Sequence, residues 1–179
     1  KSPIKKVMKG LFDEMKGEGP GKLAVKLQIP LKDEDNITFK GNYEFQNSYL
    51  INDSLGMPKI ENIFGYVEFD QNNIEIKEAK ATILDSPIKL SLNNLGDITQ
   101  VNIDGIINED FFRSAFGDDW ANKLIGEASW FGEIKIKDKT TDIMVSSDLK
   151  GLQSDLPLPF NKDKDEVKTF LFTKQASKV

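Results

Sequence analysis

The sequence changes character along one stretch: Val145-Ser146-Ser147-Asp148-Leu149-Lys150-Gly151-Leu152-Gln153-Ser154-Asp155-Leu156-Pro157-Leu158-Pro159-Phe160. It begins as a strand, because its first apolar residues alternate in phase with Ile143. It cannot end as one, because Pro157 and Pro159 lack the N–H that a sheet ladder requires and bias the residues before them towards extended geometry. We therefore expect the chain to leave a sheet here and to run over an apolar margin that needs covering.

Composition excludes much catalytic chemistry. The chain has 179 residues, a formal net charge of −5, no Cys and no His. Disulfides, thiolate or imidazole metal sites and Ser-His or Cys-His catalysis are therefore impossible within it. The acidic balance does not suit nucleic acid, and Arg113 is the sole arginine among 24 basic residues, so guanidinium clamps are nearly absent. No window approaches the roughly 20 apolar residues of a membrane helix.

The first residues predict a helix over 1–17. Ser2 and Pro3 are typical of a helix start, and the glycine-rich run 17–21 ends the pattern. Apolar residues recur at helical spacing at Ile4, Val7, Met8, Leu11, Phe12 and Met15. This helix either packs its apolar stripe on the sheet or lies with its lysines on anionic lipid. Because the sequence begins at Lys1, we expect an internal fragment of a longer protein.

From Lys22 onward the pattern has a period of two. Successive alternating runs separated by short turns predict a single β domain over 22–172, built as an antiparallel meander with one apolar and one polar face. A phase shift near Lys77 predicts a bulge, and 173–179 is expected to be a tail. We predict that nine residues line the concave side: Leu23, Val25, Leu27, Ile37, Phe39, Val67, Phe69, Leu90 and Leu92.

A helical insertion over about 109–124 interrupts the strands. Asn108 is a suitable cap, and Phe112, Phe116 and Trp120 recur every four residues, with Gly117 between two short helices. The insertion is expected to plug an open end of the sheet. The fold class is therefore mainly β: a curved antiparallel sheet, open as a half-pipe or groove, or closed into a sandwich.

The acidic residues give little support for a catalytic site or a metal site. Asp118-Asp119 and Glu109-Asp110 fall where acidic residues are ordinary, at helix starts. The 70–73 loop has oxygen ligands but lacks the glycine and distal glutamate of an EF-hand, so a plain turn is expected. We predict no enzyme activity, no metal site and no cofactor.

Several motifs resemble those of one family. The opening stretch, with its Ser147, Asp148, Leu149 and Gly151 followed by Leu156, Pro157 and Pro159 and then Lys162, resembles the "SDL-x-G … LP-x-P" segment of the YhdP family, among the AsmA-like, TamB-related envelope proteins of Gram-negative bacteria. Other segments agree in order, so that the resemblance spans roughly 22–162: 25–31, 63–69, 79–87 and 126–130. Phe160 stands where the family pattern has Leu, and Lys and Asn are unusually frequent.

The resemblance implies a function. It suggests a periplasmic protein anchored in the inner membrane by a segment outside this sequence, with a β groove that shelters phospholipid acyl chains on their way between the inner and outer membranes. Its implied partners are those acyl chains and the flanking parts of the same longer chain, and the motif residues have a structural role. The alternative is a non-catalytic β scaffold or protein-docking module of the envelope without lipid cargo.

Overall fold

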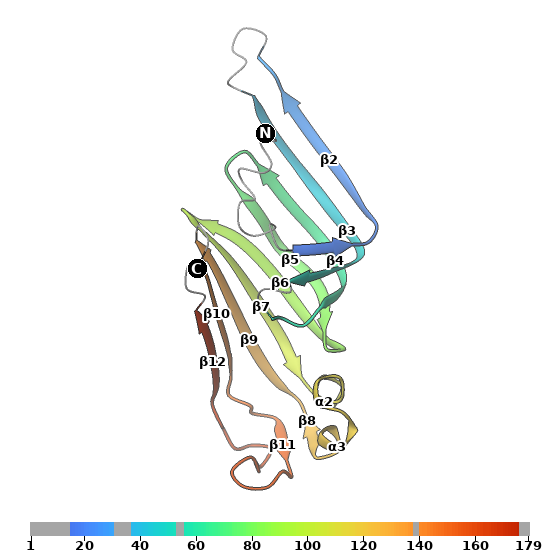
Figure 1. The fold of residues 1–179 in the computed structure, drawn as a ribbon, viewed down its shortest axis with the longest axis vertical. Coiled ribbons are helices and arrows are strands. Elements are labelled where there is room, and N and C mark those ends of the chain that lie inside the picture. Colours follow the sequence, from blue (N-terminus) through green and yellow to red (C-terminus); the bar gives the residue numbers. More distant parts are fainter. Residues whose placement is uncertain (1–14, 31–36, 53–55, 138–139, 176–179) are drawn as a thin grey trace.

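The computed structural model describes residues 15–30, 37–52, 56–137 and 140–175. Twelve strands and two helices lie in these ranges, and the helices follow β7 in the chain (Figure 1). The strands are β1 (Met15–Glu18), β2 (Gly21–Gln28), β3 (Thr38–Asn52), β4 (Ile60–Asp70), β5 (Ile74–Ile83), β6 (Ser86–Leu95), β7 (Ile98–Ile107), β8 (Leu124–Gly126), β9 (Ala128–Lys137), β10 (Thr140–Ser147), β11 (Leu152–Ser154) and β12 (Phe170–Gln175). The helices are α2 (Glu109–Phe116) and α3 (Asp118–Ala121).

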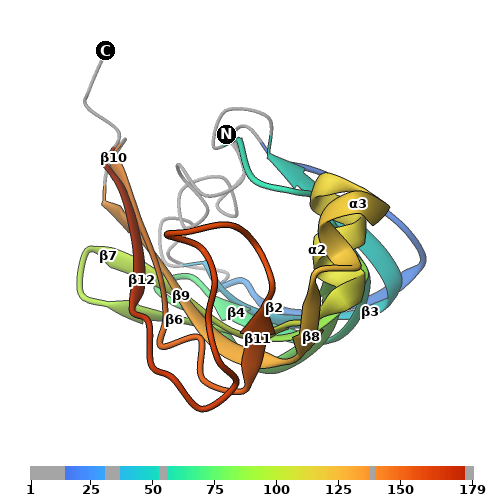
Figure 2. The same cartoon turned by 90° about the horizontal axis from the view of Figure 1, so that it is seen from below.

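Ten of the strands form one antiparallel sheet. Its order is β1, β3, β4, β5, β6, β7, β9, β10, β12, and β2 pairs with the other half of the β3 edge. The sheet is not closed, and Figure 2, seen along its length, shows it curving into an open trough. The predicted curved antiparallel sheet is confirmed in its half-pipe form. Strands β8 and β11 form a separate two-stranded sheet.

Bulges bend the central strands. The β5–β6 ladder shifts register between Ile76 and Ala79, where the sequence predicted a bulge. The β3–β4 ladder shifts on either side of Ser48, beside Asn47, whose φ is +60°. Bulges increase local twist and curvature, which favours a trough over a flat sheet. Residues 49–51 are in the second half of β3, which continues across this bend.

The predicted boundaries at both ends need correction. Residues 1–14 of the expected 1–17 helix lie outside the described residues, and Met15–Glu18 is a strand, paired in register with 49–52 of β3. At the other end, the β domain was expected to end at 172, before a tail over 173–179. The last strand, β12, runs instead from Phe170 to Gln175, in an antiparallel ladder with β10.

The helical insertion is confirmed, with Gly117 between α2 and α3. The Asn108 side chain caps α2 by accepting a hydrogen bond from Phe111 N at 3.0 Å, and it also accepts one from Ser86 Oγ at 2.6 Å. Ser114 Oγ donates to Asp85 on the β5–β6 turn. The insertion is therefore tied to the main sheet, at the end of the trough where β8 and β11 also lie (Figure 1).

Candidate functional site

Most apolar side chains of the ten-stranded sheet share one face. In an antiparallel ladder, directly paired residues point to the same side. The pairs Leu23–Tyr43 and Tyr43–Val67 carry one apolar row from β2 to β4. The pairs Leu90–Ile103 and Val145–Phe172 lie on the same face further along the sheet, the second at the β12 edge. One apolar face thus runs across the whole sheet, and we call it the concave face.

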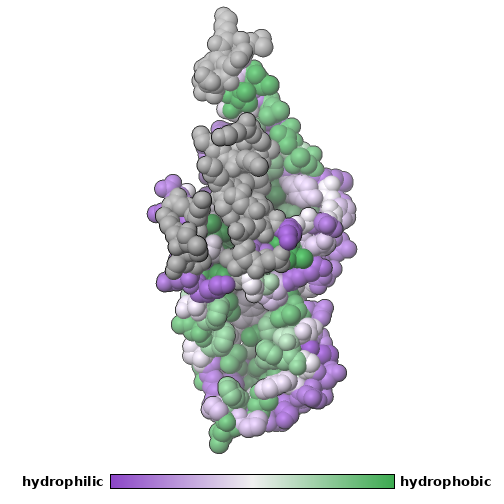
Figure 3. Space-filling view, in the orientation of Figure 1, coloured by the Kyte–Doolittle hydropathy of each residue, from purple (hydrophilic) through white to green (hydrophobic). Residues whose placement is uncertain are grey.

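Figure 3 looks into the trough in the orientation of Figure 1. Hydrophobic residues occupy the lower part of the trough and the β2 edge, and hydrophilic residues gather along the margins. The outward face carries the alternating polar residues of the same strands, such as Lys40, Lys80 and Lys89, all exposed. The period-two pattern of the strands predicted this arrangement, with apolar side chains on one face of the sheet and polar side chains on the other.

The floor and the flanks of the concave face differ in exposure. On the floor, Ile63 is 2% exposed and Ile103 is 3% exposed, both within one buried cluster that spans β4 to β10. On the β2 flank, Leu23 is 63% exposed and Leu27 is 61% exposed. On the β12 flank, Phe172 is also exposed. On the concave face, the large apolar side chains that are most open to solvent therefore lie at the two edges of the trough.

The nine residues predicted to line the concave side all lie on this face or in phase with it. Phe39, Val67 and Phe69 lie together on β3 and β4, with the Phe39 and Phe69 ring centroids 6.4 Å apart. Leu90 and Leu92 lie on β6 at the floor, where Leu92 packs in a cluster with Val67. Leu23, Val25 and Leu27 lie on β2, at the exposed flank, and Ile37, just before β3, is exposed as well.

Many further residues belong to the same face. The alternation of each strand marks them, and the ladder register shows that the separate runs point the same way. The buried ones are Ile60, Ile63, Ile74, Ala79, Ala81, Ile83, Ile88, Ile103, Ile134, Ile136 and Ile143.

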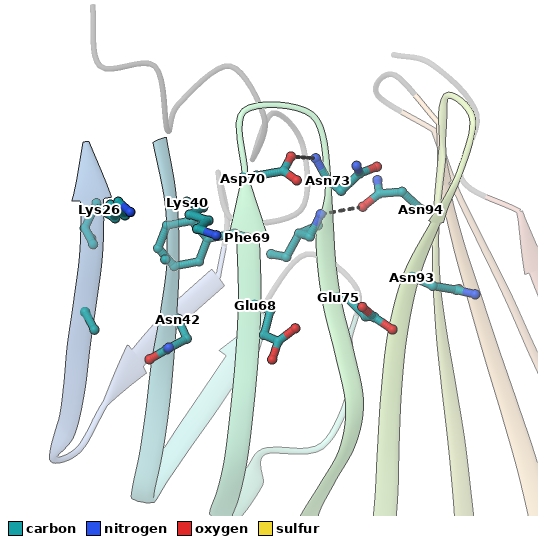
Figure 4. A pocket seen from close by; sticks show the side chains of 14 residues that line it. Lys26, Lys40, Asn42, Glu68, Phe69, Asp70, Asn73, Glu75, Asn93 and Asn94 are labelled. Carbon is teal, nitrogen blue, oxygen red and sulfur yellow. Dashed lines mark hydrogen bonds between the residues drawn. The ribbon is translucent and has the colours of Figure 1, made fainter. Parts of the chain in front are cut away.

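A cleft of about 800 Å³ lies across β2 to β6 (Figure 4). It combines apolar Phe69 and Ile74 with charges of both signs: Lys26, Lys40, Glu68, Asp70 and Glu75. Asp70 is engaged in its own turn, since its carboxylate accepts hydrogen bonds from the backbone N–H groups of Asn72 and Asn73. Because the charges are mixed, the cleft favours neither anions nor cations, and the concave face is the stronger candidate.

Hydrogen bonds to carboxylates shift the pKa values of Arg113 and Tyr49. No group of three or more carboxylates within the described ranges could hold a metal ion. Arg113 bridges Glu109, Asp110 and Asp118, and hydrogen bonds to Asp118 and then Glu109 raise the pKa of its guanidinium. The pKa of Tyr49 is raised, first by a hydrogen bond to Glu18 and then by partial burial. Both interactions join neighbouring elements.

The predicted motif residues form a compact turn after β10. Ser147 Oγ donates to Ser129 O at 2.7 Å and accepts from Leu149 N at 3.0 Å, and Leu149 has a φ of +53°. Asp148 Oδ1 accepts from Lys150 N at 3.0 Å. Gly151 has a φ of +96°, and a Cβ there would overlap the carbonyl oxygen of Glu127, so glycine is required.

The proline segment does not cover an apolar margin as expected. Leu158 is 83% exposed and Phe160 is also largely exposed, while Leu156 is half-buried. Pro157 O and Phe160 N close a turn at 2.9 Å around Pro159. The proline segment is therefore exposed to solvent, and the chain next makes buried contacts at Lys162.

Lys162 is a residue whose role the sequence did not reveal. Its side chain is buried, and its Nζ donates to the carbonyl oxygens of Leu152 and Asp163, each at 2.8 Å. Its backbone also exchanges two hydrogen bonds with Ser154. Lys162 therefore ties the loop to β11.

These features define a class of protein: an open, curved antiparallel sheet with an apolar concave face and a short helical insertion at one end. The YhdP protein family model matches residues 1–178, so the chain belongs to the YhdP family, a family of AsmA-like proteins of the bacterial envelope. Searches of curated proteins and of solved structures gave no match. None of the helices in the described ranges has the length and hydropathy to cross a membrane.

Proposed function

We propose that this chain is a non-catalytic, periplasmic part of an envelope protein that shelters lipid acyl chains on its concave face. In this way it contributes to moving phospholipid between the inner and outer membranes. The observation that carries the proposal is the apolar face that runs without interruption from β2 to β12. Membership of an AsmA-like envelope family supports the setting.

The energetics of such a face suit a carrier. Moving an acyl chain from water onto apolar surface yields about 0.8 kcal/mol for each buried CH₂. Head groups remain in water on the open side of the trough, so few specific polar contacts are needed. A chain without His and with one Arg is compatible with this kind of binding.

The exposed apolar side chains on the two flanks indicate that the concave face binds a ligand. Leu23 and Leu27 on β2, and Phe170 and Phe172 on β12, leave apolar side chains in solvent on the concave side. Contiguous exposed apolar surface of this kind marks interaction sites. We propose acyl chains as the cargo and flanking parts of the same longer chain as neighbours of the two edge strands. Membrane anchoring would then come from those flanking parts.

One observation favours a second candidate, a scaffold or docking module without lipid. The floor of the trough is almost fully buried, as at Ile63 and Ile103, so a large part of the concave face is not open to cargo. The two candidates differ in what the exposed flanks bind: acyl chains in the first, protein in the second.

Lipid extraction and native mass spectrometry of the purified chain separate the two candidates. The carrier predicts copurifying phospholipid, and Leu23→Asp with Leu27→Asp should lower its amount about tenfold by placing charge beside the acyl chains. Phe64→Asp is the matched control, because Phe64 is an exposed aromatic residue that pairs with Lys80 and Gln46 on the outward face. Absence of lipid, with the fold intact, would select the scaffold.

A further inference from the structure

Four aromatic residues form a continuous row on α2 and α3, which we call the aromatic row: Phe111, Phe112, Phe116 and Trp120. Successive ring centroids are 5.8, 5.9 and 6.4 Å apart. Their spacing in the sequence brings Phe112 and Phe116 onto one helix face, and the turn at Gly117 places Trp120 next in line.

The inner end of the row meets the concave face. Phe111 is half-buried and packs against the large core cluster of the sheet, as does Trp130 of β9. Trp130 points to the concave side, since it pairs with Gly105 in phase with Ile103 and its ring lies over Gly105. Phe112 packs against Leu124, Ala128 and Leu152. The row therefore starts on the apolar floor.

The outer end of the row is open to solvent. Phe116 and Trp120 are both more than half exposed, and Ile125, Leu158 and Phe160 are exposed on neighbouring elements of the same end. Figure 1 places α3, β8 and the chain after β11 together there. An exposed aromatic row that continues a buried apolar face differs from scattered surface residues, which are normal.

The charged side chains around the aromatic row limit which kind of ligand could bind there. Arg113 is paired with Glu109, Asp110 and Asp118, so it is not available to an anionic group. The carboxylates repel anionic head groups, while the row itself is apolar and consists of successive single rings. A single hydrocarbon chain fits these properties better than a broad protein surface.

We propose that the aromatic row is a second acyl-chain site, which continues the concave face along α2 to Trp120. This inference rests on the proposed function, because it extends the same path for the same cargo. An acyl chain that lies in the trough, along its open apolar surface, would pass Phe111 and Phe112 and reach the end of the trough at Phe116 and Trp120.

The two tryptophans of the chain, Trp120 and Trp130, report on the two parts of this path. The protein is labelled with fluorotryptophan, its two ¹⁹F resonances are assigned with Trp120→Phe, and stearate carrying a mid-chain nitroxide is added. We expect both resonances to broaden over the same concentration range. Broadening of Trp130 alone would overturn this inference and leave the proposed function standing. Broadening of neither would count against both, and broadening of Trp120 alone would contradict a continuous path.

A matched pair of variants tests the row itself. Phe116→Ser, at an exposed position, should weaken the broadening of Trp120 at least about threefold and spare that of Trp130. Phe64→Ser, an exposed phenylalanine on the outward face, should change neither. Vesicles of phosphatidylcholine with nitroxide-labelled chains form the second arm. If vesicles broaden Trp120 and free stearate does not, the row is a membrane contact and the inference is wrong.

Discussion

The ammonium group of Lys162, in the loop that follows β11, donates a hydrogen bond to the carbonyl oxygen of Leu152 in β11 at 2.8 Å. Its other close acceptor, Asp163 O, is also a carbonyl, so the buried charge is held by backbone dipoles. This contact fixes the end of the trough where the helical insertion and the small sheet meet.

Lys162→Met should lower the free energy of unfolding by about 2 kcal/mol. The substitution keeps the length of the side chain but leaves buried carbonyl oxygens without donors, and hydrogen bonds to charged groups contribute about 1.5–3 kcal/mol. Urea denaturation measures the change. Lys150→Met, at an exposed position of the turn before β11, serves as the control and should be nearly neutral. Equal stability of the two variants would show that Lys162 is not an anchor.

Gly151→Ala should destabilise the fold more than Gly96→Ala. Both glycines have positive φ, +96° and +63°, so both variants lose about 1 kcal/mol to backbone strain. At Gly151 the new methyl group also meets the Glu127 carbonyl oxygen, whereas nothing lies within 4 Å at Gly96. We expect an additional loss of about 2 kcal/mol or more at Gly151, measured as a difference in thermal or urea stability. Equal losses in the two variants would mean that Gly151, just before β11, is not in close contact with Glu127, just after β8.

Parts of this architecture could be predicted from the sequence and parts could not. Alternation is local, so the strands, the bulge near Lys77 and the apolar face around Phe39 and Leu90 were predictable. The pairing of β1 with the second half of β3 is a long-range contact without a local pattern, and the apolar stripe suggested a helix there instead. The proline segment was misread because proline chemistry shows that a chain leaves a sheet but not which surface it meets. The burial of Lys162 could not be predicted, because the carbonyl oxygens that accept its hydrogen bonds come together only in the folded loop.

Asn108→Ala should loosen the helical insertion. The change removes the cap acceptor for Phe111 N and leaves the buried Ser86 hydroxyl without its partner, at a cost of about 1–2 kcal/mol. Amide hydrogen exchange in α2 should accelerate. Asn108→Asp retains the acceptor oxygen and should keep the protection of the wild type. If both variants exchange alike, the cap does not hold the insertion.

Tyr49 should ionise at higher pH than a free tyrosine. Its hydrogen bond to Glu18 raises the pKa of the phenol, and partial burial adds to this effect. A raised folded pKa means that the tie between β1 and β3 is complete below the ordinary tyrosine pKa of about 10 and weakens as pH rises through the folded value. In ultraviolet titrations, Glu18→Gln should move one tyrosine transition to lower pH. Superimposable curves would contradict the Tyr49–Glu18 contact.

Photo-crosslinking shows directly whether acyl chains lie on the concave face. A phospholipid with a diazirine in its acyl chain is bound to the purified chain, activated, and located by peptide mass spectrometry. We predict adducts on the exposed concave flanks, at Leu23, Leu27 and Phe172, and none at Phe64 or Tyr66, which are equally exposed on the outward face. Adducts spread equally over both faces, or confined to the outward face, would contradict the account.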